Sequence, residues 1–271
     1  MCRSSRAALR LAWTAMRSNS LKHKLAAGQP ATVIAPFAPS AGLVEWLGHL
    51  GFDGVFLDCE HGSSSWAEVE DMVRAADLAG YSSIVRVERN DPATITRALD
   101  RGASGVQVPH VNTAAEAQAA VEHTKFAPLG HRGWSGGRSA FGIDGADFAS
   151  RANAETLLAI MLEEVEALDN LDEILRVEHV DVFFVAPGDL AQSMGHPGNT
   201  SHPDVNAAID DALRRIRAAG RVSGALVTPN DVDRHLELGV QYVYISLTSL
   251  LPPAASAFVQ RVHVSSPAAP R

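Results

Sequence analysis

The feature that most constrains the fold is an alternation, repeated eight times, between a short apolar run and a helical pattern. Apolar runs of this length are typical of strands buried on both faces, and parallel strands need crossover helices between them. Eight such units predict an α/β fold of the (β/α)8 TIM-barrel type. A doubly wound open sheet is the runner-up, weakened because no GxGxxG follows the first strand. The apolar runs cover residues 31–38, 52–59, 82–87, 105–110, 156–164, 180–187, 221–227 and 242–247.

The domain organisation expected for the 271 residues is one barrel with two short extensions. Residues 21–262 form the barrel. Residues 1–20 are expected to be a poorly ordered or over-extended N-terminal extension, with Met16 as the natural start, and residues 263–271 to be a disordered tail. One segment breaks the rhythm: residues 125–148 are rich in glycine, arginine and aromatic residues, and we interpret them as a cap over the barrel mouth.

Composition excludes several classes of function. The net charge is -8 and no basic tract appears, so nucleic acid is not an expected partner. No stretch of roughly 20 apolar residues could span a bilayer. Cys2 and Cys59 have no metal-ligand spacing, which fits a reducing cytoplasm. The only lysines are Lys22, Lys24 and Lys125, and none ends a predicted strand, so Schiff-base chemistry is disfavoured and metal-stabilised enolate chemistry remains.

Polar side chains gather where the predicted strands end, and in this type of barrel the active site lies at those ends. Carboxylates from adjacent strands suit Mg²⁺ or Mn²⁺ better than a soft metal. A guanidinium there can hold a substrate carboxylate or an enolate oxygen, and an imidazole can carry a proton near neutral pH. The strand-end residues are Asp58, Glu60, His61, Arg86, His110, Glu163, Glu164 and Asp189.

Several of these segments resemble the HpcH/HpaI class II, metal-dependent pyruvate aldolase family, in particular 2,4-dihydroxyhept-2-ene-1,7-dioate aldolase. The motifs that carry the resemblance are "FDGVFLDCEHG", "ITRALDRGASGVQVPHVNTAAEA", "KFAPLGHRG", "LEEVEALDNLDEI" and "VDVFFVAPGDLAQSMGHPG", in order from about Leu21 to about Leu251. The resemblance implies a single-domain barrel that assembles as a homotrimer or homohexamer, with the C-terminal helix exchanged between subunits. It also implies a lyase that cleaves 4-hydroxy-2-oxoacids to pyruvate and an aldehyde.

The same resemblance assigns catalytic roles. It makes His61 the base and Arg86 the residue that binds the substrate and stabilises the developing enolate. Asp100 matches an acid that raises the basicity of the histidine, although simple topology puts Asp100 near the opposite rim. Asp58 and Glu60 match the carboxylates that shape the histidine loop.

The resemblance also assigns the metal and substrate positions. Glu163 and Asp189 match the two protein ligands of a divalent ion, Mg²⁺ or Mn²⁺ with Co²⁺ as a further candidate. Gly188 and Asp189 match the backbone amides that receive the pyruvate carboxylate. One substrate-binding position departs from the pattern, because Met161 stands where the family commonly has glutamine and a thioether is only a weak acceptor.

We therefore expect a class II aldolase that reversibly cleaves a 4-hydroxy-2-oxoacid to pyruvate or hydroxypyruvate and an aldehyde. Two alternatives stay open. One is a carbon–carbon lyase like the citrate-lyase β-chain or malyl-CoA lyase, for which Arg132 and Arg138 could contact a CoA phosphate. The other is a catalytically altered barrel that only binds 2-oxoacids, which Met161 would allow.

Overall fold

The computed structural model describes residues 18–265, and the expectations for residues 1–17 and 266–271 lie outside this range. Eight parallel strands form a closed barrel in chain order, with β8 hydrogen-bonded to β1. This confirms the predicted (β/α)8 fold and excludes the open sheet. The strands are β1 (Ala31–Ala35), β2 (Gly54–Asp58), β3 (Ser82–Arg86), β4 (Gly105–Val108), β5 (Leu157–Leu162), β6 (Val182–Val185), β7 (Ser223–Leu226) and β8 (Tyr242–Ser246).

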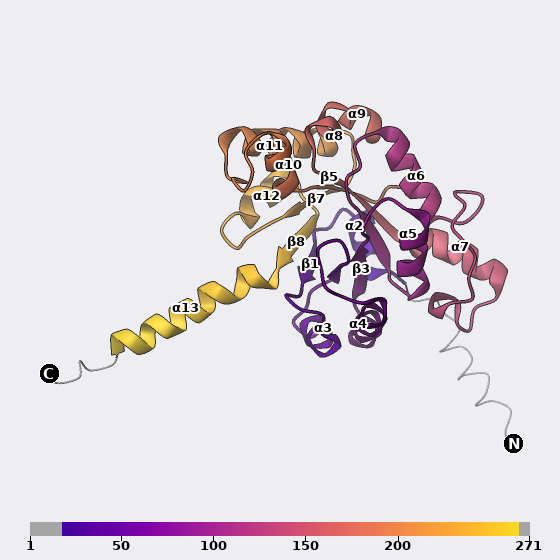
Figure 1. Cartoon of the computed structure of the whole chain (residues 1–271), viewed down its shortest axis with the longest axis horizontal. Coiled ribbons are helices and arrows are strands. Elements are labelled where there is room, and N and C mark those ends of the chain that lie inside the picture. Colours follow the sequence, from indigo (N-terminus) through magenta and orange to yellow (C-terminus); the bar gives the residue numbers. More distant parts are fainter. Residues whose placement is uncertain (1–17, 266–271) are drawn as a thin grey trace, which may run out of the picture.

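The helices surround the barrel, as Figure 1 shows. Helix α4 and helix α12 end at Gly80 and Gly239, whose φ angles of 80° and 94° are left-handed and favour glycine. The helices are α2 (Ser20–Ala26), α3 (Ala41–Gly48), α4 (Trp66–Ala79), α5 (Pro92–Asp100), α6 (Ala114–Thr124), the 3-10 turn η1 (Arg138–Ala140), α7 (Gly145–Glu155), α8 (Val165–Asp169), α9 (Leu171–Ile174), α10 (Pro187–Ser193), α11 (Pro203–Ala218), α12 (Val232–Leu238) and α13 (Leu247–Ser265).

Two hydrophobic layers hold the fold together. The larger lies between the strands and the helices, where the apolar face of α4 (Val69, Met72, Val73 and Ala76) is buried. The second fills the barrel interior and includes Leu21 and Leu25 of α2. Asn19 caps α2, is almost fully buried, and donates to the carbonyl of Ser104 at 2.9 Å. Helix α2 therefore closes the N-terminal end of the barrel.

The segment 125–148 does not cover the mouth, so that expectation is wrong. Arg132 binds Asp100 at the end of α5, and Arg138 binds Asp77 in the last turn of α4. Both helices run back from the mouth and end near the N-terminal ends of the strands. The segment packs there because it connects α6 to the start of β5.

The helical pattern predicted after β5 is divided into α8 and α9. Asn170 lies between them with ψ near 5°, and its side chain donates to the carbonyl of Asn112 at 2.9 Å. Helix α13, in contrast, is longer than the others and extends away from the barrel (Figure 1). No helix within residues 18–265 is both long and apolar enough to cross a membrane.

Candidate active site

A charged network at the mouth begins with a pair on neighbouring strands. Asp58 and Arg86 are the last residues of β2 and β3 and lie opposite one another in register. Arg86 donates from Nε to Oδ1 of Asp58 at 3.0 Å and from Nη2 to Oδ2 at 2.7 Å. Its Nη1 lies 3.1 Å from Oε2 of Glu60. Burial raises the pKa of Asp58, but the bonds from Arg86 outweigh this and lower it.

The loop after β2 is shaped by the same carboxylate. Oδ1 of Asp58 accepts the backbone N–H groups of Glu60 at 3.0 Å and His61 at 3.2 Å. A Cβ at Gly62 would lie 2.0 Å from the carbonyl oxygen of Asp58, so only glycine fits this tight turn. The turn leaves the His61 side chain 66% exposed, with Nε2 3.9 Å from Oε2 of Glu60. His61 is thus held at the rim, where a substrate could reach its imidazole.

Glu163 and Asp189 meet the chemical requirements of a divalent-cation site. The Glu163 side chain is 1% exposed, and its Oε1 accepts the backbone N–H of His110 at 2.8 Å. Its Oε2 is buried and has no hydrogen-bond partner within residues 18–265. Burial, with the carboxylates of Asp189 and Glu60, raises the pKa of Glu163 despite the bond from His110. A buried acceptor without a partner is costly, and a cation shared with Asp189 would satisfy it.

His110 connects the two halves of this network; it was expected at the end of the fourth strand, but no role was predicted for it. Its Nε2 lies 3.2 Å from Oε1 of Glu60, and its Nδ1 lies 2.9 Å from Oε1 of Glu164. Partial burial lowers the pKa of His110, but Glu163, Glu164 and Glu60 outweigh it and the net shift is upward. Its φ of 53° is uncommon for a residue other than glycine. The only signal in the sequence was its position directly after the fourth strand.

The remaining predicted residues lie in different places. Met161 is buried inside the barrel with Phe56 and Phe184. Gly188 and Asp189 occupy the first turn of α10, exposed and half-buried respectively. Asp100 lies at the C-terminal end of α5 and binds Arg132 at 2.9 Å. Within one chain the structure therefore does not bring Asp100 to His61, which lies after β2 at the opposite end of the barrel.

A cavity of about 250 Å³ opens beside Asp58. Tyr244 from β8 contributes to its wall and packs edge-on against Phe56, with ring centroids 4.8 Å apart. Burial raises the pKa of Tyr244 to about 12, so its hydroxyl stays protonated at neutral pH. Cys59, between Asp58 and Glu60, packs against the outer core, and burial raises its pKa to about 12 as well. This places the thiol with the apolar residues rather than in the charged network.

Comparison with known proteins agrees with this geometry. The family model described as HpcH/HpaI aldolase/citrate lyase matches residues 37–249. The chain belongs to this family. It is 37% identical over 250 residues to the 4-hydroxy-2-oxo-heptane-1,7-dioate aldolase of Klebsiella pneumoniae subsp. pneumoniae, covering 90% of this chain and 94% of that protein. It is 38% identical over 210 residues to the 2-dehydro-3,6-dideoxy-6-sulfogluconate aldolase of Pseudomonas putida, covering 76% and 82%.

Solved structures of the HpcH/HpaI family have the same fold. A family protein from Burkholderia cenocepacia superimposes with a TM-score of 0.85 at 32% identity, covering 91% of this chain and 100% of that one. The predicted family and barrel are confirmed. Because the relatives are named as aldolases, the chain is a carbon–carbon lyase of the aldolase type, and this supports the aldolase interpretation over the two alternatives.

Proposed function

We propose that this chain reversibly cleaves a 4-hydroxy-2-oxoacid to pyruvate, or hydroxypyruvate, and an aldehyde. The observation that carries the proposal is the unpartnered Oε2 of Glu163, buried near Asp189 at the same mouth as Arg86 and His61. The names of the relatives support this substrate class, since one is an aldolase for 4-hydroxy-2-oxo-heptane-1,7-dioate.

Glu163 and Asp189 would hold the divalent ion, Mg²⁺ or Mn²⁺ with Co²⁺ as a further candidate. When bound, the ion would supply positive charge beside the 2-oxo group, worth several kcal/mol of charge stabilisation. The backbone N–H groups of Gly188 and Asp189 would receive the substrate carboxylate, because both lie in the first turn of α10, whose N–H groups are not used within the helix. Met161 would form the floor below the substrate.

Side chains of the protein would transfer the proton and stabilise the negative charge of the enolate. His61 removes the proton from the 4-hydroxyl, and the C3–C4 bond breaks to release the aldehyde. The electron pair of that bond passes to the three-carbon fragment as an enolate, which becomes pyruvate when C3 takes up a proton. Arg86 has five N–H donors, of which the hydrogen bonds to Asp58 use two, so donors remain for the enolate oxygen even with the ion pair to Glu60. Asp58 and Glu60 hold Arg86 and the His61 loop in place.

Two parts of the proposal require a second copy of the chain. Asp100 could act on His61 only from a neighbouring subunit, since the two lie at opposite ends of one barrel. Helix α13 has the exposed apolar side chains that an exchanged helix would bury: Leu251, Phe258, Val259 and Val262. We therefore propose a homotrimer or homohexamer, located in the cytoplasm and acting on small molecules rather than on nucleic acid or membranes.

The acyl-CoA alternative loses its phosphate-binding candidates. Arg132 is committed to Asp100 and Arg138 to Asp77, both away from the mouth. The decisive experiment is a panel of aldehydes with pyruvate and hydroxypyruvate, run with Mg²⁺, Mn²⁺, Co²⁺ or chelator, beside an acyl-CoA thioester. We expect aldol products only when metal is present. Thioester cleavage would favour the acyl-CoA lyase, and tight oxalate binding with no turnover would favour a binding protein.

A further inference from the structure

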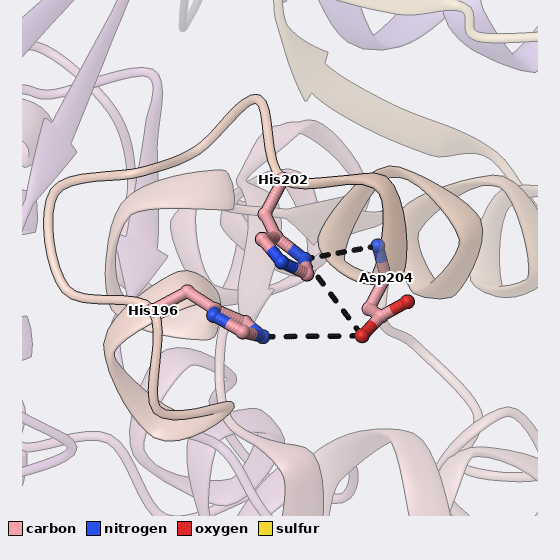
Figure 2. Close-up of side chains that lie close together, drawn as sticks. All are labelled: His196, His202 and Asp204. Carbon is pink, nitrogen blue, oxygen red and sulfur yellow. Dashed lines mark hydrogen bonds and ion pairs between the residues drawn. The ribbon is translucent and has the colours of Figure 1, made fainter.

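A second group of side chains of types that can bind metals lies outside the barrel, in the connection from α10 to α11 (Figure 2). His196 follows α10, His202 is the N-cap of α11, and Asp204 is in the first turn of α11. Their donor atoms all lie within 4.8 Å of one another. Oδ2 of Asp204 is 4.0 Å from Nε2 of His196 and 3.8 Å from Nδ1 of His202. None of these residues belongs to the proposed catalytic site.

The backbone at both histidines is already fixed. The N–H of His196 donates to the carbonyl of Ala191 in α10 at 2.7 Å, and the N–H of His202 donates to the carbonyl of Asn199 at 3.1 Å. The N–H of Asn199 in turn donates to the carbonyl of His196 at 3.0 Å. A ligand that bound these side chains would therefore have to order side chains but little backbone, which lowers the entropy cost of binding.

We propose that His196, His202 and Asp204 form a second divalent-cation site, specific for a first-row transition ion such as Zn²⁺, Co²⁺ or Ni²⁺. Two imidazoles and one carboxylate suit these ions, whereas Mg²⁺ prefers an all-oxygen shell. The two histidine side chains are each 29% exposed and Asp204 is 72% exposed, so water can complete the coordination. This site therefore favours Zn²⁺ over Mg²⁺, whereas the two-carboxylate site at the mouth favours Mg²⁺ or Mn²⁺.

Binding requires a small rearrangement of the two rings. They are stacked, with centroids 3.6 Å apart and planes 13° from parallel, and rings in this arrangement cannot both aim a nitrogen lone pair at one ion. The two rings must rotate away from each other. At present Nδ1 of His202 accepts a long hydrogen bond, 3.2 Å, from the backbone N–H of Asp204. Coordination of an ion through Nδ1 would replace this hydrogen bond. An ion bound here would join the end of α10 to the start of α11. We therefore expect it to raise the melting temperature rather than take part in the reaction.

The test separates the two metal sites by variants of the full chain. In the Glu163→Gln/Asp189→Asn background, which removes the proposed mouth ligands, calorimetry should show about one equivalent of Zn²⁺ bound and no Mg²⁺. Adding His196→Ala should weaken Zn²⁺ binding at least about tenfold, since loss of outer partners of metal ligands alone costs 10- to 100-fold. Adding Asp204→Asn, which keeps the size of the side chain, should weaken it too. Co²⁺ should give visible absorption bands that depend on His196.

The matched control is His49→Ala, which removes an exposed histidine elsewhere on the surface. Zn²⁺ affinity equal in the background protein and in its His196→Ala derivative overturns the proposal. So does an equal loss in the His49→Ala derivative, because it would mean that Zn²⁺ binds surface histidines without selection. Loss of aldolase activity plays no part in these readouts, so the outcome is independent of the proposed function.

Discussion

Arg86 binds Asp58 through two parallel hydrogen bonds across neighbouring strands, from Nε at 3.0 Å and from Nη2 at 2.7 Å. This fork fixes the orientation of the guanidinium, and Nη1 lies 3.1 Å from Oε2 of Glu60 in a further ion pair. The group is therefore preorganised before substrate arrives, which is the condition under which a charged donor stabilises a transition state most. A point charge at the same position would lack this orientation.

Replacing Arg86 with lysine should lower aldol cleavage by about 10²–10³, because one preorganised stabiliser of charge is lost. If Arg86 stabilises the enolate, the exchange of pyruvate C3 protons with solvent, followed by NMR, should fall by a similar factor. The control is Arg89→Lys, an exposed arginine in the loop after β3, which should leave both rates unchanged. Normal exchange in Arg86→Lys would show that the arginine does not act on the enolate.

His61→Ala should separate the same two assays. If His61 acts on the 4-hydroxyl, cleavage should fall by about 10²–10⁴, the usual effect of removing a general base, while pyruvate exchange falls less. The imidazole is 66% exposed, so its removal should not change the melting temperature appreciably. A His61→Ala enzyme that cleaves at the normal rate would exclude the assignment.

The two neighbouring glutamates after β5 should differ in metal binding. Glu163→Gln should abolish high-affinity Mn²⁺ binding measured by calorimetry, because Gln offers no charge. Its metal-free melting temperature should not fall, since a buried carboxylate with a raised pKa is replaced by a neutral group of similar size. Glu164→Gln is the matched control and should retain Mn²⁺ binding, because Glu164 contacts His110 and Asn112 instead. Loss of Mn²⁺ binding in Glu164→Gln but not in Glu163→Gln would identify Glu164 as the metal ligand.

Activity should also require the ion itself. Treatment with EDTA followed by dialysis should remove aldol turnover, and Mg²⁺ or Mn²⁺ should restore it. Full turnover in the chelated protein would contradict the role assigned to Glu163 and Asp189.

The sequence predicted the barrel and the strand ends that carry charge because both follow from local pattern. Buried parallel strands are continuous apolar runs, and polar residues at their C-terminal ends must converge once the barrel closes. It could not predict how His110 is used, since His110 follows β4 and its side chain contacts the residues that follow β2 and β5. The prediction placed the segment 125–148 at the wrong end of the barrel. Its composition indicates a packed loop but does not indicate against which end of the barrel that loop packs. Asp100 shows the same limit, since its partner Arg132 lies in that segment.

Helix α13 should carry the subunit contact. Phe258 and Val262 are four residues apart, therefore on one helical face, and are 69% and 50% exposed. Glutamate at both positions should convert the oligomer to a monomer, as measured by light scattering after size-exclusion chromatography, because charge would have to be buried at the contact. Gln260→Glu adds one negative charge elsewhere on the helix and should leave the oligomer intact. An unchanged mass for the double variant would assign the contact to another surface.

Lys125 should make stability depend on pH above neutrality. Its side chain is buried, Nζ donates to the carbonyls of Asn153 at 3.0 Å and Thr156 at 2.8 Å, and burial lowers its pKa to about 7. In the unfolded chain the pKa is about 10.4. Between these values the unfolded chain binds a proton that the folded chain has released, so the free energy of unfolding rises with pH from this group. The increase is at most about 1.4 kcal/mol per pH unit.

Lys125→Met removes this contribution while keeping an unbranched side chain. The free energy of unfolding of the wild type minus that of Lys125→Met, from urea titrations at pH 7 to 9.5, should therefore increase with pH. Lys24→Met is the control, because Lys24 is partly exposed and pairs with Asp53 at 2.8 Å. The free energy of unfolding of the wild type minus that of Lys24→Met should not rise over this pH range. A flat difference for Lys125→Met would mean that the two carbonyls keep the ammonium protonated in spite of its burial.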